Sequence, residues 1–460
     1  MFEKRSFNRS RSVHTMGIPF YFASLIRNHP GITRIVKERY NTNVLGIDGN
    51  CLIHRYLKPE DPIKSVLDAI DHIVTEVCTA DRIILAMDGL VPYAKIVQQR
   101  YRRMRKKEDE DPLDNYPFDR NQISPGTPYM KELEAGIRMR FPHIELSSTF
   151  EPGEGEHKLF QKMRNTKQDS VCIYGLDADL ILLCLAQHGI TKPFQFYLLR
   201  ESGEFNDPKL KEAEFSMMSI WALKEHLNMD VSQYLALSVL CFGNDFMPNI
   251  GMFSLREDGY SRAMYMYEKA GKPDLFTFEG RDVFLTMAGK EEMSVLKERI
   301  SLRRRPYEKA IWGTGKDVAR RYRLHVLDGV EDMEPVVRAF WKTFHWTLQY
   351  FMTNEVIDWS WHYPYVDAPL VEDILKYDEY EDNERVELNF TIADQLAFIL
   401  PAASLRVAKR VVVYPNEVYT ETRELWLKNH DWECEPRISL PWCPKQSSSS
   451  HGLTEIVPLA

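Results

Sequence analysis

VLGID at residues 44–48 is an apolar run that ends in an aspartate, and the same design recurs in RIILAMD at residues 82–88 and VCIYGLD at residues 171–177. Each run predicts a strand buried on both faces, as in a parallel sheet, because a strand covered on one face alternates apolar with polar residues. Ligands of open α/β sheets collect at the carboxyl ends of the strands. We therefore expect Asp48, Asp88 and Asp177 to converge.

Four more carboxylates stand in short motifs, which brings the candidate acids to seven. Two like charges about 4 Å apart repel by about 4 kcal/mol at an effective dielectric near 20, so converging acids require protonation or a divalent cation. Hard oxygen ligands favour Mg²⁺, with Mn²⁺ as a substitute, and the chain has no Cys/His cluster with zinc spacing. Two ions about 3.5–4 Å apart can hold the attacking water and the leaving oxygen of a phosphodiester. The predicted catalytic and metal-binding residues are Asp48, Asp88, Glu154, Glu156, Asp177, Asp179 and Asp245.

A basic segment, AKIVQQRYRRMRKK at residues 94–107, directly follows the Asp88 turn and contains no acid. On a helix, Lys95, Gln99, Arg102 and Arg103 share one face. That face can point toward the acids and bind an anionic group such as a terminal phosphate. Basic runs are also found as solvated helices or nuclear-import signals, so this alternative stays open on the segment alone.

Ten motifs in order along the chain carry a resemblance to a known family. They are MGIPFYF (16–22), IDGNCLIH (47–54), MDGLVPYAKIVQQRYRR (87–103), SPGTPYM (124–130), GEGEHK (153–158), YGLDADLILL (174–183), GNDFMP (243–248), WSWHYPYVDAP (359–369), DQLAFILPAAS (394–404) and DWECEPRISLP (431–441). Together they resemble the two conserved regions of the 5′→3′ exoribonucleases of the Xrn type. GLVP at residues 89–92 and SPGTPYM depart from the commoner GVAP and ITPGT of the family, and neither departure touches an acid.

The resemblance implies a fold and an activity. The fold is α/β, with a parallel or mixed central sheet flanked by helices (a PIN/FEN-like nuclease core) and a mainly helical, aromatic-rich second region packed onto it. The activity is processive hydrolysis of 5′-monophosphorylated single-stranded RNA to nucleoside 5′-monophosphates with two Mg²⁺ ions, as in mRNA decay. A monophosphate pocket carries over to Lys95, Gln99, Arg102 and Arg103, and base stacking carries over to His54 and Trp432. His54 could equally be a core histidine.

Composition excludes several other classes of protein. The 460 residues are 44% hydrophobic, so they can bury a sizeable core, yet no apolar run reaches the length of a membrane span. Seven cysteines without CxxC spacing indicate reduced thiols, and we expect an intracellular monomer, cytoplasmic rather than nuclear. A net charge of −8 is compatible with RNA binding, because the predicted acids carry seven negative charges and the basic segment concentrates positive charge locally.

The expected domain organisation has five parts. Residues 1–15 are a disordered basic extension, 16–255 the catalytic core, 256–340 a helical connecting region, 341–435 the second region that closes the site, and 436–460 a flexible tail. A second basic group, Arg303, Arg304, Arg305, Lys316, Arg320, Arg321 and Arg323, either tracks the RNA strand or is a solvated helical face. The compact length fits a large DNA virus or a minimal eukaryote.

Three rival functions remain. A flap endonuclease would carry a helix-hairpin-helix after the last acid, and the residues that follow Asp245 give no convincing version of that motif. A non-catalytic RNA-binding relative is disfavoured because all seven acids are retained. A phosphatase with an Asp nucleophile would need a DxDx[TV]-like strand end, which GLDADLILL lacks. The sequence leaves the choice between RNA and DNA open, because no residue can be assigned to a 2′-hydroxyl.

Overall fold

The computed structural model describes residues 18, 20–104, 118–164, 169–191, 195–202, 213–298, 317–325, 327, 330–365, 367–380 and 384–400. The expected terminal extension, the tail and Trp432 lie outside these residues. Within the described ranges, no helix combines the length and the apolar character needed to cross a lipid bilayer.

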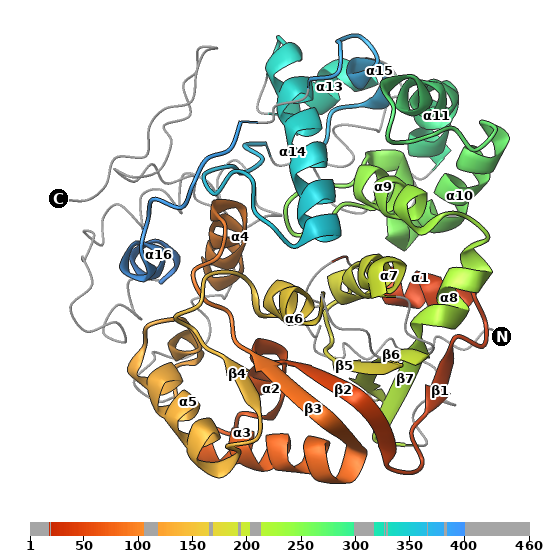
Figure 1. Cartoon of the computed structure of the whole chain (residues 1–460). Helices are drawn as coiled ribbons and strands as arrows, with labels where there is room; N and C mark the ends of the chain where they lie inside the picture. Colours follow the sequence, from red (N-terminus) through yellow and green to blue (C-terminus); the bar gives the residue numbers. More distant parts are fainter. Residues whose placement is uncertain are drawn as a thin grey trace, which may run out of the picture.

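A seven-stranded mixed sheet forms the centre of the N-terminal region, in the order β1-β7-β6-β5-β2-β3-β4 (Figure 1). Strands β6, β5, β2, β3 and β4 are parallel, and β7 and β1 extend the sheet through antiparallel pairs. The bounds are β1 Thr33–Ile35, β2 Tyr40–Asp48, β3 Cys78–Ala86, β4 Glu145–Ser147, β5 Ser170–Tyr174, β6 Gln195–Glu201 and β7 Phe215–Ser219. The three strands expected from the apolar runs are confirmed, and they are neighbours in the order β5-β2-β3.

Both faces of the sheet are buried, which explains why the strand sequences are apolar without alternation. Val44 and Ile84 point into the core shared with α6 (Gly155–Met163) and α7 (Asp179–Thr191). Their neighbours Leu45 and Leu85 point into a second core with α2 (Gly49–Tyr56), α3 (Pro62–His72) and α5 (Pro128–Arg140). Figure 1 shows these two helical layers on opposite sides of the strands.

The remaining helices extend the first layer or belong to the part that follows it. They are α1 Tyr21–Asn28, α4 Tyr93–Met104, α8 Ile220–Leu227, α9 Val231–Phe242, α10 Gly259–Lys269, α11 Phe278–Glu298, α13 Val318–His325, α14 Glu334–Thr353, α15 Val371–Ile374 and α16 Ile392–Ile399. Short π and 3-10 turns lie at Ile73–Val77, Arg120–Gln122, Gly251–Phe253 and Leu255–Glu257. The predicted class, α/β with a helical and aromatic-rich second region, is confirmed.

The second region packs onto the N-terminal region in two places. Helix α14 contacts α7 and α9, and its buried aromatic residues join the larger core. Helix α16 packs against α4, and Phe398 and Leu396 form a separate cluster there with Ile96 and Val97 (Figure 1). The expected division between residues 340 and 341 falls inside α14, which runs across it without a break. The domain division as a whole stays a prediction.

Candidate active site

Six of the seven predicted acids follow strand ends or begin helices that start beside those ends, and Asp245 lies in the loop after α9. Asp48 is the last residue of β2 and caps α2, where its Oδ1 accepts hydrogen bonds from the backbone N–H groups of Asn50 and Cys51. Glu154 precedes α6 and Glu156 lies in its first turn. Strands β2 and β5 are neighbours whose connections leave the sheet in opposite directions, so the acids near their ends lie at a topological switch point.

Lys95 joins acids from distant parts of the chain. Its Nζ lies 2.6 Å from Glu154 Oε2 and 2.7 Å from Asp245 Oδ2. All three side chains are at most 8% exposed. The backbone N–H of Gly155 donates to Asp88 Oδ1 over 2.8 Å, which brings the turn after β3 against the start of α6. Folding therefore gathers these acids into one buried acidic cluster, defined here as the seven predicted carboxylates.

The carboxylates of the cluster differ in whether their oxygen atoms accept hydrogen bonds from the protein. Asp88 accepts from Gly155 and from the Asn50 side chain, and Glu154 accepts from Lys95 and from the Tyr350 hydroxyl. Three buried oxygen atoms have no hydrogen-bond partner among the described residues: Glu156 Oε2, Asp177 Oδ1 and Asp179 Oδ1. A buried carboxylate oxygen left without a partner is costly, so these three atoms indicate a place for a cation.

Burial and mutual repulsion raise the pKa values of five acids of the cluster, namely Asp48, Glu154, Glu156, Asp177 and Asp179. Burial, with Asp88 as the next contributor, raises the pKa of Asp48 to about 7. Burial and the nearby Asp245 raise the pKa of Asp177 to about 6. The pKa of Asp179 is raised well above its usual range by burial and by Asp177. The pKa of Asp245 is lowered instead, because burial, which alone would raise it, is outweighed by Lys95 together with other residues of α4.

The donor set fits a hard divalent cation, because it consists of carboxylate oxygens. In the described part of the chain, however, no group of three His, Cys, Asp or Glu side chains is arranged to hold a metal ion as it stands. The Lys95 ammonium supplies positive charge inside the cluster instead. Burial disfavours this ammonium, but Asp245 and Glu154 raise the pKa of Lys95 well above its usual value.

The predicted phosphate-binding face lies on α4, as expected. Gln99, Arg102 and Arg103 are half-buried, while Lys95 is turned into the acidic cluster. Arg103 Nη2 donates to Ser124 Oγ over 2.8 Å, and its Nη1 has no hydrogen-bond partner among the described residues. The same holds for Gln99 Oε1. Arg102 is close enough to the cluster to contribute to lowering the pKa of Asp245.

Of the residues predicted to stack on bases or to track the RNA strand, only some lie in the described part of the chain. His54 is half-buried in the last turn of α2. Its proposed stacking partner Trp432 lies outside the described residues, as do Arg303, Arg304, Arg305 and Lys316. Arg323, on α13, pairs with the buried Asp373, which gives that arginine a structural partner.

Sequence reasoning missed two residues that contact the acids. Asn50 bridges to Asp88, where its Nδ2 lies 3.0 Å from Oδ2 and its Oδ1 accepts from the Asp88 backbone N–H over 3.0 Å. Asn50 stands two residues after Asp48 in the motif IDGN, and this position could have marked it as a residue of the site. Tyr350 donates its hydroxyl to Glu154 Oε1 over 3.0 Å. It stands among many aromatic residues of α14, so nothing in the sequence marks it.

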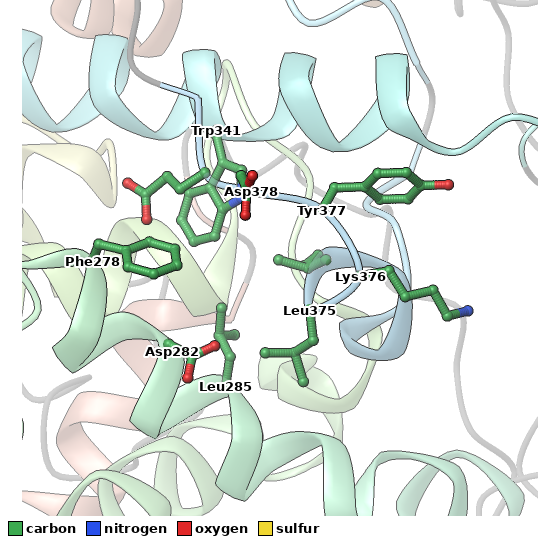
Figure 2. Close-up of a pocket in the computed structure, with 10 residues that line it drawn as sticks. Phe278, Asp282, Leu285, Trp341, Leu375, Lys376, Tyr377 and Asp378 are labelled. Carbon is green, nitrogen blue, oxygen red and sulfur yellow. The ribbon is translucent and has the colours of Figure 1, made fainter.

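A cavity of about 80 Å³ lies apart from the acidic cluster (Figure 2). Phe278, Asp282 and Leu285 of α11 line it together with Trp341 of α14 and residues 374–379, and none of the seven acids does. Beside it, Glu379 accepts from both Arg281 and His345. These contacts bind the chain after α15 to α11 and α14.

Comparison with known families finds two matches. Residues 16–202 match the family described as XRN 5′-3′ exonuclease N-terminus. Residues 319–409 match the family described as Xrn1 helical domain. The first match contains six of the seven acids and the whole predicted phosphate-binding face, and the second contains α14 and α16.

Similar curated proteins are much longer than this chain. The 5′-3′ exoribonuclease 1 of Saccharomyces cerevisiae is 27% identical over 55% of the chain and 21% of its own length. The 5′-3′ exoribonuclease 1 of Homo sapiens is 25% identical over 85% of the chain and 31% of its own length. The chain thus spans about a fifth to a third of these two relatives. Among solved structures, the flap endonuclease-1 of Methanococcus jannaschii is 14% identical, with a TM-score of 0.32 over 52% of this chain and 74% of its own.

Proposed function

Because the chain belongs to the Xrn family of 5′-3′ exonucleases, we propose that it is a processive exoribonuclease. Its proposed substrate is single-stranded RNA with a 5′ monophosphate, and its products are nucleoside 5′-monophosphates. The observation that supports this most directly is the buried acidic cluster next to the cationic face of α4, because three of its carboxylate oxygens have no hydrogen-bond partner among the described residues.

Divalent ions, Mg²⁺ or Mn²⁺, would be held by Glu156, Asp177 and Asp179, whose free oxygens face no other donor in the described chain, together with Asp48. When bound, two such ions lower the pKa of an attacking water and stabilise the leaving oxygen. Asp88 and Glu154 would help to shape the site, since their oxygens already accept hydrogen bonds from the protein.

The 5′ phosphate would be bound at the end of α4, chiefly by Arg103. Arg103 holds one guanidinium edge against Ser124 and leaves Nη1 for an anion, and Arg102 lies toward the acids. A guanidinium fixed in this way presents the N–H groups of Nη1 to a phosphate from a set position. Each hydrolysis leaves a new 5′ phosphate on the shortened strand, so the same pocket can bind the product as the next substrate.

Digestion of matched RNAs tests the proposal. Purified protein is incubated in Mg²⁺ with one single strand that carries a 5′ monophosphate, a 5′ hydroxyl or a 5′ triphosphate, and products are followed by chromatography. We expect mononucleotides from the monophosphate only. The double variant Asp177→Asn, Asp179→Asn should release none, because it removes two carboxylates that each have one oxygen atom without a hydrogen-bond partner among the described residues.

The matched control is Asp81→Asn, which changes an exposed acid on β3 that pairs only with Asn43 among the described residues. It should digest RNA like the unaltered chain. Equal digestion of all three 5′ ends would refute the phosphate pocket. RNA binding without digestion would indicate a non-catalytic relative, and preferred cleavage of a DNA flap would indicate a structure-specific nuclease.

A further inference from the structure

The C-terminal end of α14 is docked on α6, the helix that begins at the acids (Figure 1). Arg164 donates to the backbone carbonyls of Met352 and Thr353, and Gln161 donates to that of Asn354. Carbonyl groups at a helix end have no partner within the helix, so these three contacts satisfy them from α6. Asn354 itself ends α14 at φ 58°, ψ 20°.

The ring of Tyr350 is enclosed between two acid-bearing motifs. It stacks on His157 of GEGEHK with ring centroids 3.6 Å apart and planes 9° from parallel. Phe246 of GNDFMP contacts it edge-on at 5.8 Å. His157 is held in turn, since its Nδ1 lies 2.9 Å from Asn354 Oδ1. The ring is 1% exposed, so its position leaves the hydroxyl little freedom.

That hydroxyl donates to Glu154 Oε1, while the other oxygen of Glu154 pairs with Lys95. Glu154 therefore has one partner from α4 and one from α14. Without the Tyr350 hydroxyl, the hydrogen bond that fixes Oε1 would be lost. The carboxylate of Glu154 could then rotate about its Cγ–Cδ bond. A hydrogen bond to an acid of a metal site sets the orientation of that acid and the affinity for the ion.

We propose that Tyr350 is a positioning residue through which α14 orients Glu154 and thereby sets the affinity of the acidic cluster for divalent ions. The inference rests on the proposed function, because it takes the cluster to bind such ions. In this proposal, the second region helps to build the active site through α14, in addition to packing against α4 through α16.

Tyr350→Phe removes the hydroxyl and keeps the stacked ring. The matched control is Tyr363→Phe, which deletes another buried hydroxyl of the second region, one that donates to the Asp367 carbonyl over 2.9 Å. Mn²⁺ affinity is measured by titration calorimetry, and thermal unfolding is measured in EDTA. We expect both variants to lose similar stability. Only Tyr350→Phe should bind Mn²⁺ more weakly, by about tenfold or more.

A double-mutant cycle tests whether Tyr350→Phe weakens Mn²⁺ binding through Glu154 or through a general loss of packing around the site. In a Glu154→Gln background, Tyr350→Phe should have no further effect on Mn²⁺ affinity if it acts through Glu154. Equal Mn²⁺ affinity of Tyr350→Phe and the unaltered chain, or an undiminished effect in the Glu154→Gln background, would overturn the inference and leave the proposed function standing. Absence of Mn²⁺ binding by the unaltered chain would instead refute the metal site of the proposed function.

Discussion

At the scale of single residues, the most informative side chain is Lys95. It was expected on a phosphate-binding face and lies instead between Glu154 and Asp245, buried and paired with both. A buried ion pair adds little net stability, but removing one partner leaves an uncompensated charge. Lys95 is thus the internal counter-charge of the cluster in the absence of a bound ion.

Lys95→Met should lower the stability of the protein in EDTA by about 3–5 kcal/mol, because two buried carboxylates lose their cation. Mn²⁺ should restore more stability to this variant than it adds to the unaltered chain, since the ion would supply the missing charge. Thermal unfolding with and without Mn²⁺ measures both effects.

Lys64→Met is the control for this substitution. Lys64 pairs with Asp68 on the exposed surface of α3, where solvent screens both charges and the pair adds little stability. Unchanged stability of Lys95→Met in EDTA would contradict the role given to Lys95.

Arg103 provides a second test at this scale. Arg103→Gln should reduce the preference for 5′-phosphate over 5′-hydroxyl RNA by about tenfold or more, because a hydrogen bond to a charged group contributes about 1.5–3 kcal/mol. The ratio of kcat/KM for the two RNAs is the measurement. Arg39→Gln, at an exposed arginine that contacts the Thr75 carbonyl, should leave the ratio unchanged. An unaltered ratio in Arg103→Gln would place the phosphate elsewhere.

At the scale of elements, α11 and α15 are joined through a buried carboxyl. Glu292 on α11 is 1% exposed, and its Oε1 accepts from the backbone N–H of Val371 at the start of α15 over 3.0 Å. Its Oε2 has no partner among the described residues. Burial raises the pKa of Glu292 to about 7, so the folded protein holds a proton there that the unfolded chain releases at lower pH.

The folded state therefore binds more protons than the unfolded state between about pH 4.5 and 7, and stability falls as pH rises through that window. Glu292→Gln should be more stable than the unaltered chain above pH 7, by up to about 3 kcal/mol, with the difference vanishing near pH 4.5. Unfolding in denaturant at a series of pH values measures it. Glu291→Gln, beside it in a surface pair with Lys269, is the control. A constant difference across pH would exclude titration of Glu292 as the cause.

At the scale of the whole molecule, the acids come from positions between residues 48 and 245, so only the folded chain can bring them together. A ligand that binds the folded state alone stabilises it, by about 2.7 kcal/mol at a concentration a hundredfold above its Kd. Mn²⁺ should therefore raise the Tm of the chain relative to EDTA. The variant Asp177→Asn, Asp179→Asn should lose most of this rise, and an equal rise in both proteins would show that the ion binds elsewhere.

Much of the fold follows from the sequence. Runs such as RIILAMD predicted the central parallel strands because a strand between two helical layers has no face left for polar residues. As a result, the neighbouring residues Ile84 and Leu85 pack into opposite hydrophobic cores. Strand β1 and the antiparallel edge pairs were not foreseen, since short edge strands carry little periodic signal.

The sequence by itself also determined which residue types form the cluster and that α4 is a basic helix, because motifs and helical spacing are local properties. Only the tertiary structure decided that Lys95 pairs with acids and that three carboxylate oxygens have no partner in the described part of the chain. It also decided that Tyr350 contacts Glu154, which lies 196 positions earlier in the sequence. Such contacts depend on how α4, α6 and α14 pack against one another. That packing is set by the shapes of whole buried surfaces, which no short stretch of sequence contains.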